Sequence, residues 1–371
     1  MRVLHLGNGN LYGGIERFLV GLALMQRRTA LLENHFLLSH EGRLSRELRN
    51  AGTEPSFVEH TRISRPWTVL RARRRVTSIV KTLHPDVVVS HGAWTHAVLA
   101  EGVPRSTPVV FYCHNPVTHD WLHRLAAQRP PEYVLANSQF TRRSVGSLFA
   151  EAPSEVVTYV LTGSVAGSTR AELRREFASP GELVILQVSR LERWKGQSLL
   201  LDAAEALAPV PGWRIWFVGG AQRPNERKYE AELRARSLGT SLSGRVDFLG
   251  ERSDVADVLA TADVFCQPNL EHEPFGLVFV EAMAAGRPII TTLGGGPAEF
   301  LTDDFSLLVP PEPAPLAAAL RRVITVRELR ESMGDAAARS YASRFDPVRA
   351  TEELAAALTR ATTRAARSAW A

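Results

Sequence analysis

Short apolar runs alternate with longer segments of helical periodicity from the start of the chain to Val160. The runs with the length of buried strands are Val3–Leu6, His35–Leu38, Ser56–Glu59, Asp86–Ser90, Val109–Tyr112, Tyr133–Ala136 and Val156–Val160. The segments with helical spacing are Ile15–Gln26, Leu44–Ala51, Trp67–Leu83 and Gln139–Phe149. Apolar strands separated by amphipathic helices predict a parallel sheet with helices on both faces.

The alternation restarts after Thr162–Ser168, a stretch rich in Gly, Ser and Thr that suits an interdomain linker. The second set of predicted strands is Leu183–Val188, Arg214–Val218, Arg245–Leu249, Val264–Gln267, Pro288–Thr291 and Ser306–Val309. The sequence therefore predicts an α/β protein of two Rossmann-like, doubly wound domains, residues 1–165 and 166–349. Ligands of such domains bind at the carboxyl ends of the strands, so we expect them in a central cleft. An Ala-rich helix closes the chain from Pro347 onward.

Composition narrows the functional classes. A net charge of +5 over 371 residues is modest, and no RNP, zinc-finger or helix-turn-helix pattern occurs, so nucleic acid is not an expected partner. No apolar run reaches the 18 or so residues that a membrane span needs, and the N-terminus reads as a strand rather than a signal peptide. We therefore expect a cytoplasmic protein. Cys113 and Cys266 lie far apart in or beside apolar runs, which indicates reduced, buried thiols and no metal site.

The segment Pro268–Glu299 is the richest in candidate chemistry. Glu273 precedes Pro-Phe-Gly, and the apolar run Leu277–Ala285 then predicts a short buried helix. The start of this helix offers a phosphate the backbone N–H groups of Phe275, Gly276 and Leu277. Glu281 inside the helix is costly unless it accepts hydrogen bonds, and a ribose diol supplies two donors. The alternative is a structural pairing of Glu281 with an arginine.

Two strand ends of the first half carry further candidates. The first strand is followed by Gly13 and Gly14 before a helix, which lets a ligand approach the backbone, although a simple tight turn needs the same residues. The G-x-G-x-x-G spacing of a dinucleotide-binding loop is not there. His114 follows the strand Val109–Tyr112 and can donate a hydrogen bond to a phosphate or a sugar hydroxyl. His91, at the end of the preceding strand, competes for this role.

The strand Leu183–Val188 leads into a loop with Arg190 and Lys195. A guanidinium grips phosphate oxygens in pairs and a lysine adds a mobile charge, so the two suit a diphosphate leaving group. Arg193 can replace either of them, and two surface cations are the alternative. The chain has three lysines among many arginines, which makes Lys195 stand out.

The spacing of Glu273 and Glu281, with Pro-Phe-Gly between them and Ala-Gly-Arg-Pro after, resembles the signature of the retaining family 4 glycosyltransferases of the GT-B fold. This resemblance implies that the closing helix, residues 350–371, packs back on the N-terminal domain, which binds the acceptor, while the second domain binds the donor. It implies catalytic roles for His114, Glu273, Arg190 and Lys195. It also implies donor contacts from Gly13, Gly14, Phe275, Gly276, Leu277, Glu281, Gly294, Gly295 and Glu299. The segment Thr162–Ala166 departs from the family because it lacks an acidic turn residue.

The expected activity is a retaining transfer of a hexose from a nucleoside diphosphate sugar to a hydroxyl, with a UDP-hexose preferred to a GDP-hexose. No cofactor or metal is expected, since the chain has no Asp-x-Asp motif to hold a divalent ion on the diphosphate. The acceptor is a glycan, a lipid-linked or a small molecule. The alternatives are a UDP-sugar epimerase and a catalytically degenerate binding scaffold. The Arg-rich segment Arg62–Lys81, with its apolar stripe, leaves open a peripheral attachment to an anionic membrane.

Overall fold

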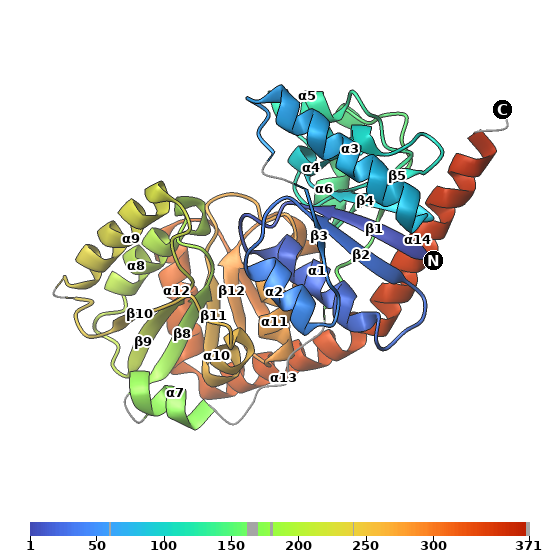
Figure 1. The fold of residues 1–371 in the computed structure, drawn as a ribbon. Coiled ribbons are helices and arrows are strands. Elements are labelled where there is room, and N and C mark those ends of the chain that lie inside the picture. Colours follow the sequence, from blue (N-terminus) through green and yellow to red (C-terminus); the bar gives the residue numbers. More distant parts are fainter. Residues whose placement is uncertain (59–60, 162–169, 179–180, 240, 369–371) are drawn as a thin grey trace. The chain divides into compact units, whose positions relative to one another are not determined.

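The structure is a computed structural model that describes residues 1–58, 61–161, 170–178, 181–239 and 241–368. The chain forms two compact units, Met1–Thr162 with Phe345–Ala371 and Gly163–Arg344. Each unit is a sheet flanked by helices (Figure 1). The predicted linker Thr162–Ser168 and the predicted strand end at Glu59 lie outside the described residues.

The described residues of the first domain form a seven-stranded parallel sheet in the order β3-β2-β1-β4-β5-β6-β7. Its strands are β1 Arg2–Gly7, β2 Glu33–Leu38, β3 Ser56–Phe57, β4 Val87–His91, β5 Val109–Cys113, β6 Tyr133–Ala136 and β7 Ser154–Val156. Its helices are α1 Gly14–Met25, α2 Arg43–Asn50, α3 Pro66–Leu83, α4 Ala93–Leu99, α5 Trp121–Ala126, α6 Gln139–Arg143 and α14 Pro347–Ser368. The central strands are buried on both faces, which explains their continuous apolar sequence.

The second domain repeats this plan with a six-stranded parallel sheet, over the described residues, in the order β10-β9-β8-β11-β12-β13. Its strands are β8 Leu183–Val188, β9 Trp213–Val218, β10 Val246–Gly250, β11 Val264–Gln267, β12 Ile289–Thr292 and β13 Ser306–Val309. Its helices are α7 Arg170–Phe177, α8 Gln197–Glu205, α9 Pro224–Ser237, α10 Val255–Thr261, α11 Leu277–Ala284, α12 Pro313–Thr325 and α13 Arg327–Arg344. The predicted fold class, two doubly wound α/β domains, is confirmed.

The prediction of a strand at Val156–Val160 is wrong, because β7 ends at Val156. Val157 still donates its backbone N–H to Ala136 of β6 at 2.9 Å, and the apolar residues beyond it are buried against α1, where the ring of Tyr159 stacks on that of Phe18. A Cβ atom on Gly21 of α1 would lie 2.5 Å from the carbonyl oxygen of Val160, so the helix and this segment touch backbone to backbone. The predicted helix Gln139–Phe149 is also too long, since α6 ends at Arg143 and a 3₁₀ turn follows at Val145–Ser147.

Helix α14 belongs to the first domain, as the resemblance implies. Leu354 and Leu358 on its inner face are buried, which stabilises the docked helix by about 1.5–3 kcal/mol for each leucine. Arg360 adds an ion pair with Glu155 at the end of β7, with 2.7 Å between Nη2 and Oε2. The chain therefore returns to its first domain after completing the second (Figure 1).

Candidate functional site

Two loops of the second domain meet at the carboxyl ends of the neighbouring strands β8 and β11. Lys195 Nζ lies 2.5 Å from Glu273 Oε2, and only 14% and 12% of the two side chains are exposed. The backbones of the two loops are also in close contact. A Cβ on Gly196 would lie 1.7 Å from the Pro268 carbonyl oxygen, so a side chain does not fit there. The structure therefore brings together two predicted site residues that are 78 positions apart.

Arg190 is held by two carboxylates that sequence reasoning missed. Its Nη2 lies 2.9 Å from Glu192 and its Nη1 3.3 Å from Glu226, which is 2% exposed. Glu226 also accepts backbone hydrogen bonds from Gln222 and Arg223 at the start of α9, so it is rigidly placed. These contacts fix the guanidinium of Arg190 beside the Lys195 loop. Glu226 has no sequence signal, since an acid in the first turn of a helix is ordinary.

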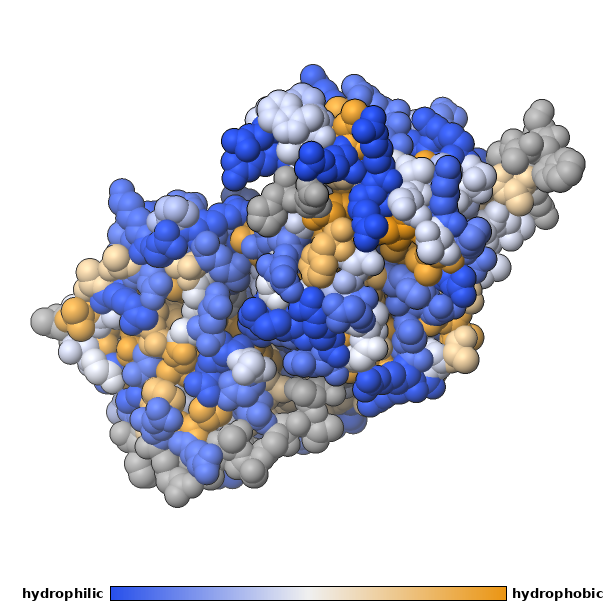
Figure 2. Space-filling model, in the orientation of Figure 1, coloured by the Kyte–Doolittle hydropathy of each residue, from blue (hydrophilic) through white to orange (hydrophobic). Residues whose placement is uncertain are grey.

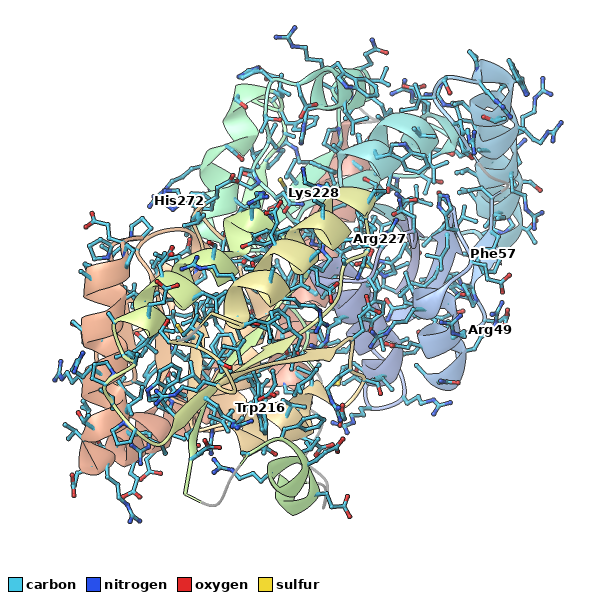
Figure 3. The ribbon with its side chains drawn as sticks, turned by 90° about the vertical axis from the view of Figure 1, so that its left-hand side faces the viewer. Arg49, Phe57, Trp216, Arg227, Lys228 and His272 are labelled. Carbon is cyan, nitrogen blue, oxygen red and sulfur yellow. The ribbon has the colours of Figure 1, made fainter. Side chains whose placement is uncertain are left out.

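Arg193, which competed with Arg190 and Lys195 in the sequence, turns toward α9. Its guanidinium pairs with Glu232 and lies 4.7 Å above the ring of Tyr229. Helix α9 also carries Arg227 and Lys228, which are labelled in Figure 3. The structure therefore separates Arg193 from the Lys195–Glu273 pair, and Arg190 is the guanidinium fixed within this loop.

Three buried glutamines support these loops, although sequence reasoning did not select them. Gln187 donates to the carbonyl of Lys195 at 2.7 Å, and Gln197 donates to the carbonyl of Arg190 at 2.9 Å. Gln267 donates to Asn269 at 3.3 Å, and the amide of Asn269 lies 3.4 Å from Glu273. For Gln187 and Gln267 the available signal was a polar side chain inside an apolar strand, because a buried amide needs a partner; Gln197, the first residue of α8, carries no such signal.

The glycine run 294–296 packs against the Glu273 loop. A Cβ on Gly295 would lie 2.4 Å from the carbonyl oxygen of Glu273, and one on Gly294 would lie 2.5 Å from the ring of His272 (labelled in Figure 3). Gly296 donates its backbone N–H to the Glu273 carbonyl at 2.8 Å. The close approach inferred from this sequence is therefore to the protein's own backbone. Glu299, at the end of the same turn, is exposed.

Helix α11 begins at Leu277, the residue that the sequence predicts. Gly276 is its N-cap with a φ of 78°, a conformation that favours glycine. Phe275 and Leu277 are buried, and the ring of Phe275 lies 5.5 Å from that of Phe300. Glu281 occupies the fifth position of the helix and is half-buried. Glu273 therefore lies in the loop before α11 and Glu281 lies inside the helix, as their spacing in the sequence suggests.

In the first domain, His114 is an interior residue with 3% of its surface exposed. Its Nε2 lies 2.8 Å from His91 Nδ1, and its Nδ1 lies 2.6 Å from the hydroxyl of Tyr159. Burial lowers the pKa of His114 to about 3, so the imidazole is neutral at pH 7. The two histidines that competed in the sequence are hydrogen-bonded to each other, and Tyr159 was missed because its segment read as a strand.

Gly13 is the N-cap of α1 and Gly14 is the first residue of this helix, after the loop that follows β1. Among the described residues, the nearest heavy atom to a Cβ on Gly13 is Glu16 Oε2 at 3.8 Å, and the φ of −162° suits any residue. The fold itself therefore does not require glycine at position 13, in contrast to Gly196 and Gly295. Gly14 is exposed.

Comparison with known proteins gives matches over both domains. The family model "Glycosyltransferase Family 4" matches residues 12–159, and "Glycosyl transferases group 1" matches residues 169–340. A lipopolysaccharide core biosynthesis glycosyltransferase of Rhizobium meliloti, LpsE, is 31% identical over 50% of this chain and 51% of its own length. A D-inositol 3-phosphate glycosyltransferase of Corynebacterium kroppenstedtii is 35% identical over 52% of this chain and 44% of its own length. The chain thus spans about half the length of the curated relatives it matches.

Solved structures match over nearly the whole chain. Anabaena HepE in complex with UDP and glucose has a TM-score of 0.81 at 25% identity, covering 97% of this chain and 99% of HepE. A glycosyltransferase of Rickettsia africae has a TM-score of 0.78 at 17% identity, covering 95% and 97%, which shows the shared fold. The chain belongs to glycosyltransferase family 4, with the two doubly wound domains of the GT-B fold.

Proposed function

We propose that the protein transfers a hexose from a nucleoside diphosphate sugar to an acceptor hydroxyl, with retention of the anomeric configuration and without a metal. The observation that carries this proposal is the convergence of Lys195, Arg190 and Glu273 at the ends of β8 and β11. The loop after β8 carries both cations, and Lys195 meets Glu273 at the end of β11, an arrangement that suits a ligand with a diphosphate next to a sugar.

The two cations stabilise the charge that develops on the departing diphosphate, the contribution that usually dominates such catalysis. Each is paired with a carboxylate, so the diphosphate competes with Glu273 for Lys195, while Arg190 stays anchored by Glu226. The backbone N–H groups at the start of α11 add fixed positive dipoles. The acceptor hydroxyl attacks from the same face of the sugar that the diphosphate leaves, and an oxygen of the diphosphate takes the proton of that hydroxyl. The configuration is therefore retained without a protein nucleophile.

The donor lies along the Glu273–Glu281 segment in this proposal. Glu273 accepts hydrogen bonds from sugar hydroxyls and Glu281 accepts them from the ribose diol, since a half-buried carboxylate gains most from such donors. We propose UDP-hexose over GDP-hexose, and HepE, which was solved with UDP and glucose, supports this choice. GDP is the competing nucleotide. A GDP-mannose-dependent mannosyltransferase of Corynebacterium glutamicum is 33% identical over 46% of this chain and 47% of its own length.

We place the acceptor on the first domain. Gly13 and Gly14 then lie beside the acceptor and the phosphate of the donor. The room for a Cβ at Gly13 supports this placement, because no described residue brings an atom closer than 3.8 Å to it. Glu299 stands beyond the glycine run as a further donor contact. The acceptor is an alcohol of a glycan, a lipid-linked or a small molecule.

We further propose that α3 holds the protein at the surface of an anionic membrane. No helix among the described residues is long and apolar enough to cross a membrane. Trp67 of α3 is 63% exposed and Trp121, the first residue of α5, is 64% exposed. Helix α3 and its preceding loop also expose Arg62, Arg65, Arg71, Arg74 and Arg75. Hydrophilic and hydrophobic residues interleave over this part of the first domain (Figure 2). Exposed tryptophan beside arginine suits a membrane interface. A cytoplasmic location stays a prediction.

A thermal-shift panel of nucleoside diphosphate sugars tests the donor. A donor at 100 times its Kd adds about 2.7 kcal/mol of stability, so the donor that raises Tm most identifies sugar and base. Incubating that donor with an alcohol then separates transfer from the alternatives. A new glycoside of retained configuration supports the proposal, an isomerised sugar nucleotide indicates an epimerase, and binding without any product indicates a scaffold.

A further inference from the structure

A line of hydrogen-bonded side chains crosses the interior of the first domain from Asn34 to Tyr159. Asn34 Oδ1 lies 3.0 Å from His5 Nε2, and His5 Nδ1 lies 3.0 Å from His91 Nε2. The line continues from His91 through His114 to the hydroxyl of Tyr159. All five residues are buried and come from β2, β1, β4 and the segments that follow β5 and β7. Of these five residues, the sequence predicts a role for His114 and, as its competitor, for His91.

The amide of Asn34 sets the direction of every hydrogen bond in this line. Asn34 Nδ2 lies 3.3 Å from the carbonyl oxygen of Leu22, which can only accept, so the amide oxygen faces His5. His5 must then carry its proton on Nε2. A neutral imidazole has one donor and one acceptor, so His5 Nδ1 accepts from His91 Nε2 and His91 Nδ1 accepts from His114 Nε2. His114 Nδ1 is left as an acceptor for the hydroxyl of Tyr159.

The histidines of this line are neutral. An added proton would place two N–H groups against each other in one of the bonds, and burial lowers the pKa of His5 to about 4. The terminal amide of Asn34 does not accept a proton at neutral pH. The line therefore does not carry protons through the domain, and its effect is to fix orientation and tautomer.

We propose that Asn34, His5 and His91 are positioning residues that hold His114 as the neutral Nε2–H tautomer. His114 Nδ1 then accepts a hydrogen bond from a hydroxyl, that of Tyr159 or that of a sugar in its place, and does not donate one to a phosphate. This inference rests on the proposed function only where it assigns the hydroxyl to a substrate sugar. The tautomer follows from the contacts of the chain itself.

Nitrogen NMR of the full-length protein with ¹⁵N-labelled histidine reads the tautomers directly. In the wild type, His5, His91 and His114 each give the Nε2–H signature between pH 6 and 8. A His114 protonated on Nδ1 in the wild type overturns the proposal without any variant. Asn34→Leu removes the acceptor that sets the direction, so His114 gains an Nδ1–H population although it does not touch residue 34. Asn34→Gln keeps an amide that accepts from His5 without adding a charge and restores the wild-type pattern.

His96 is the matched control within the same domain. It is fully buried and stands outside the line, with Nε2 2.7 Å from the carbonyl of Arg129 and Nδ1 2.7 Å from Ser90 Oγ. If the substitution acts through the hydrogen bonds of the line, the nitrogen signals of His96 stay unchanged in both Asn34 variants. A His96 that changes together with His114 in Asn34→Leu indicates a disturbed fold and contradicts the proposal.

Turnover supplies the functional readout. Asn34→Leu lowers kcat about tenfold at an unchanged donor KM, the size of one hydrogen bond to the reacting complex, and Asn34→Gln recovers it. Equal turnover in all three proteins overturns the positioning role. The tautomer signals are read without turnover, so they support or contradict the inference even in a protein that transfers no sugar.

Discussion

Gly13 and Gly295 provide a matched pair of alanine substitutions that separates a glycine the fold needs from one that the ligand needs. Gly295 has a φ of 78°, and its Cβ would lie 2.4 Å from the carbonyl oxygen and 2.9 Å from the amide nitrogen of Glu273. The left-handed backbone costs about 1–2 kcal/mol with a side chain, and relieving such an overlap costs about 1–3 kcal/mol more. Gly295→Ala therefore destabilises the second domain by at least about 2 kcal/mol.

At about 2–4 °C per kcal/mol for a domain of this size, Tm falls by about 4–8 °C. Turnover falls as well, because the new methyl group displaces the backbone of Glu273. Gly13→Ala has no such cost, since its φ is extended and the nearest atom of a described residue to its Cβ is Glu16 Oε2 at 3.8 Å, so stability changes by less than about 0.5 kcal/mol. Its turnover nevertheless falls at least about tenfold if a substrate phosphate approaches there.

Thermal unfolding followed by circular dichroism, with turnover of the identified donor, checks both variants. Full turnover in Gly13→Ala would refute the close approach of a ligand to α1. A wild-type Tm in Gly295→Ala would refute the packing of the glycine run on the Glu273 loop.

Three further results are expected. Burial lowers the pKa of His5 and His96 to about 4, below the 6.5 of an unfolded chain, so the unfolded state binds more protons between these values. The free energy of unfolding of the first domain therefore falls as the pH drops from 6.5 toward 4, by up to about 1.4 kcal/mol per pH unit for each histidine. The Tm falls with it, and a constant Tm contradicts this. Turnover survives EDTA; loss of activity that magnesium or manganese restores would show that Arg190 and Lys195 do not suffice. Anionic vesicles sediment the wild type at physiological salt and release Trp67→Ala, whereas Leu238→Ala, an exposed apolar site on the second domain, behaves as the wild type.

The two sheets could be predicted because buried parallel strands have nearly continuous apolar sequences, and β6, β8, β11 and β13 have the predicted bounds. The edge strand β7 could not, since its residues are half-buried and the apolar residues after it pack under α1. Helix α4, Ala93–Leu99, is too short to show a helical period and was not predicted.

The candidate site was predicted where a residue's own chemistry is unusual for its place, as for Lys195 and Glu273. The supporting residues were not predicted. The role of a single glutamine, or of an acidic residue in the first turn of a helix, depends on which groups the fold places beside it. Gln187 and Glu226 show this, since each is recognised by the backbone or guanidinium that it holds. The direction of the line through His114 depends on Asn34, whose partners lie 12 and 29 residues away in sequence.

Calorimetric titration of UDP and GDP into Glu273→Gln and Glu281→Gln tests the placement of the donor most directly. Glu281→Gln weakens binding of the bare nucleotide by about tenfold to a hundredfold, since a charge-assisted hydrogen bond to the ribose is worth about 1.5–3 kcal/mol. Glu273→Gln binds the nucleotide at least as tightly as the wild type, because Lys195 loses its competing carboxylate, and shows its defect in turnover of the intact donor. Equal weakening of nucleotide binding by both variants, with the fold intact by circular dichroism, would contradict the placement of the donor along this segment.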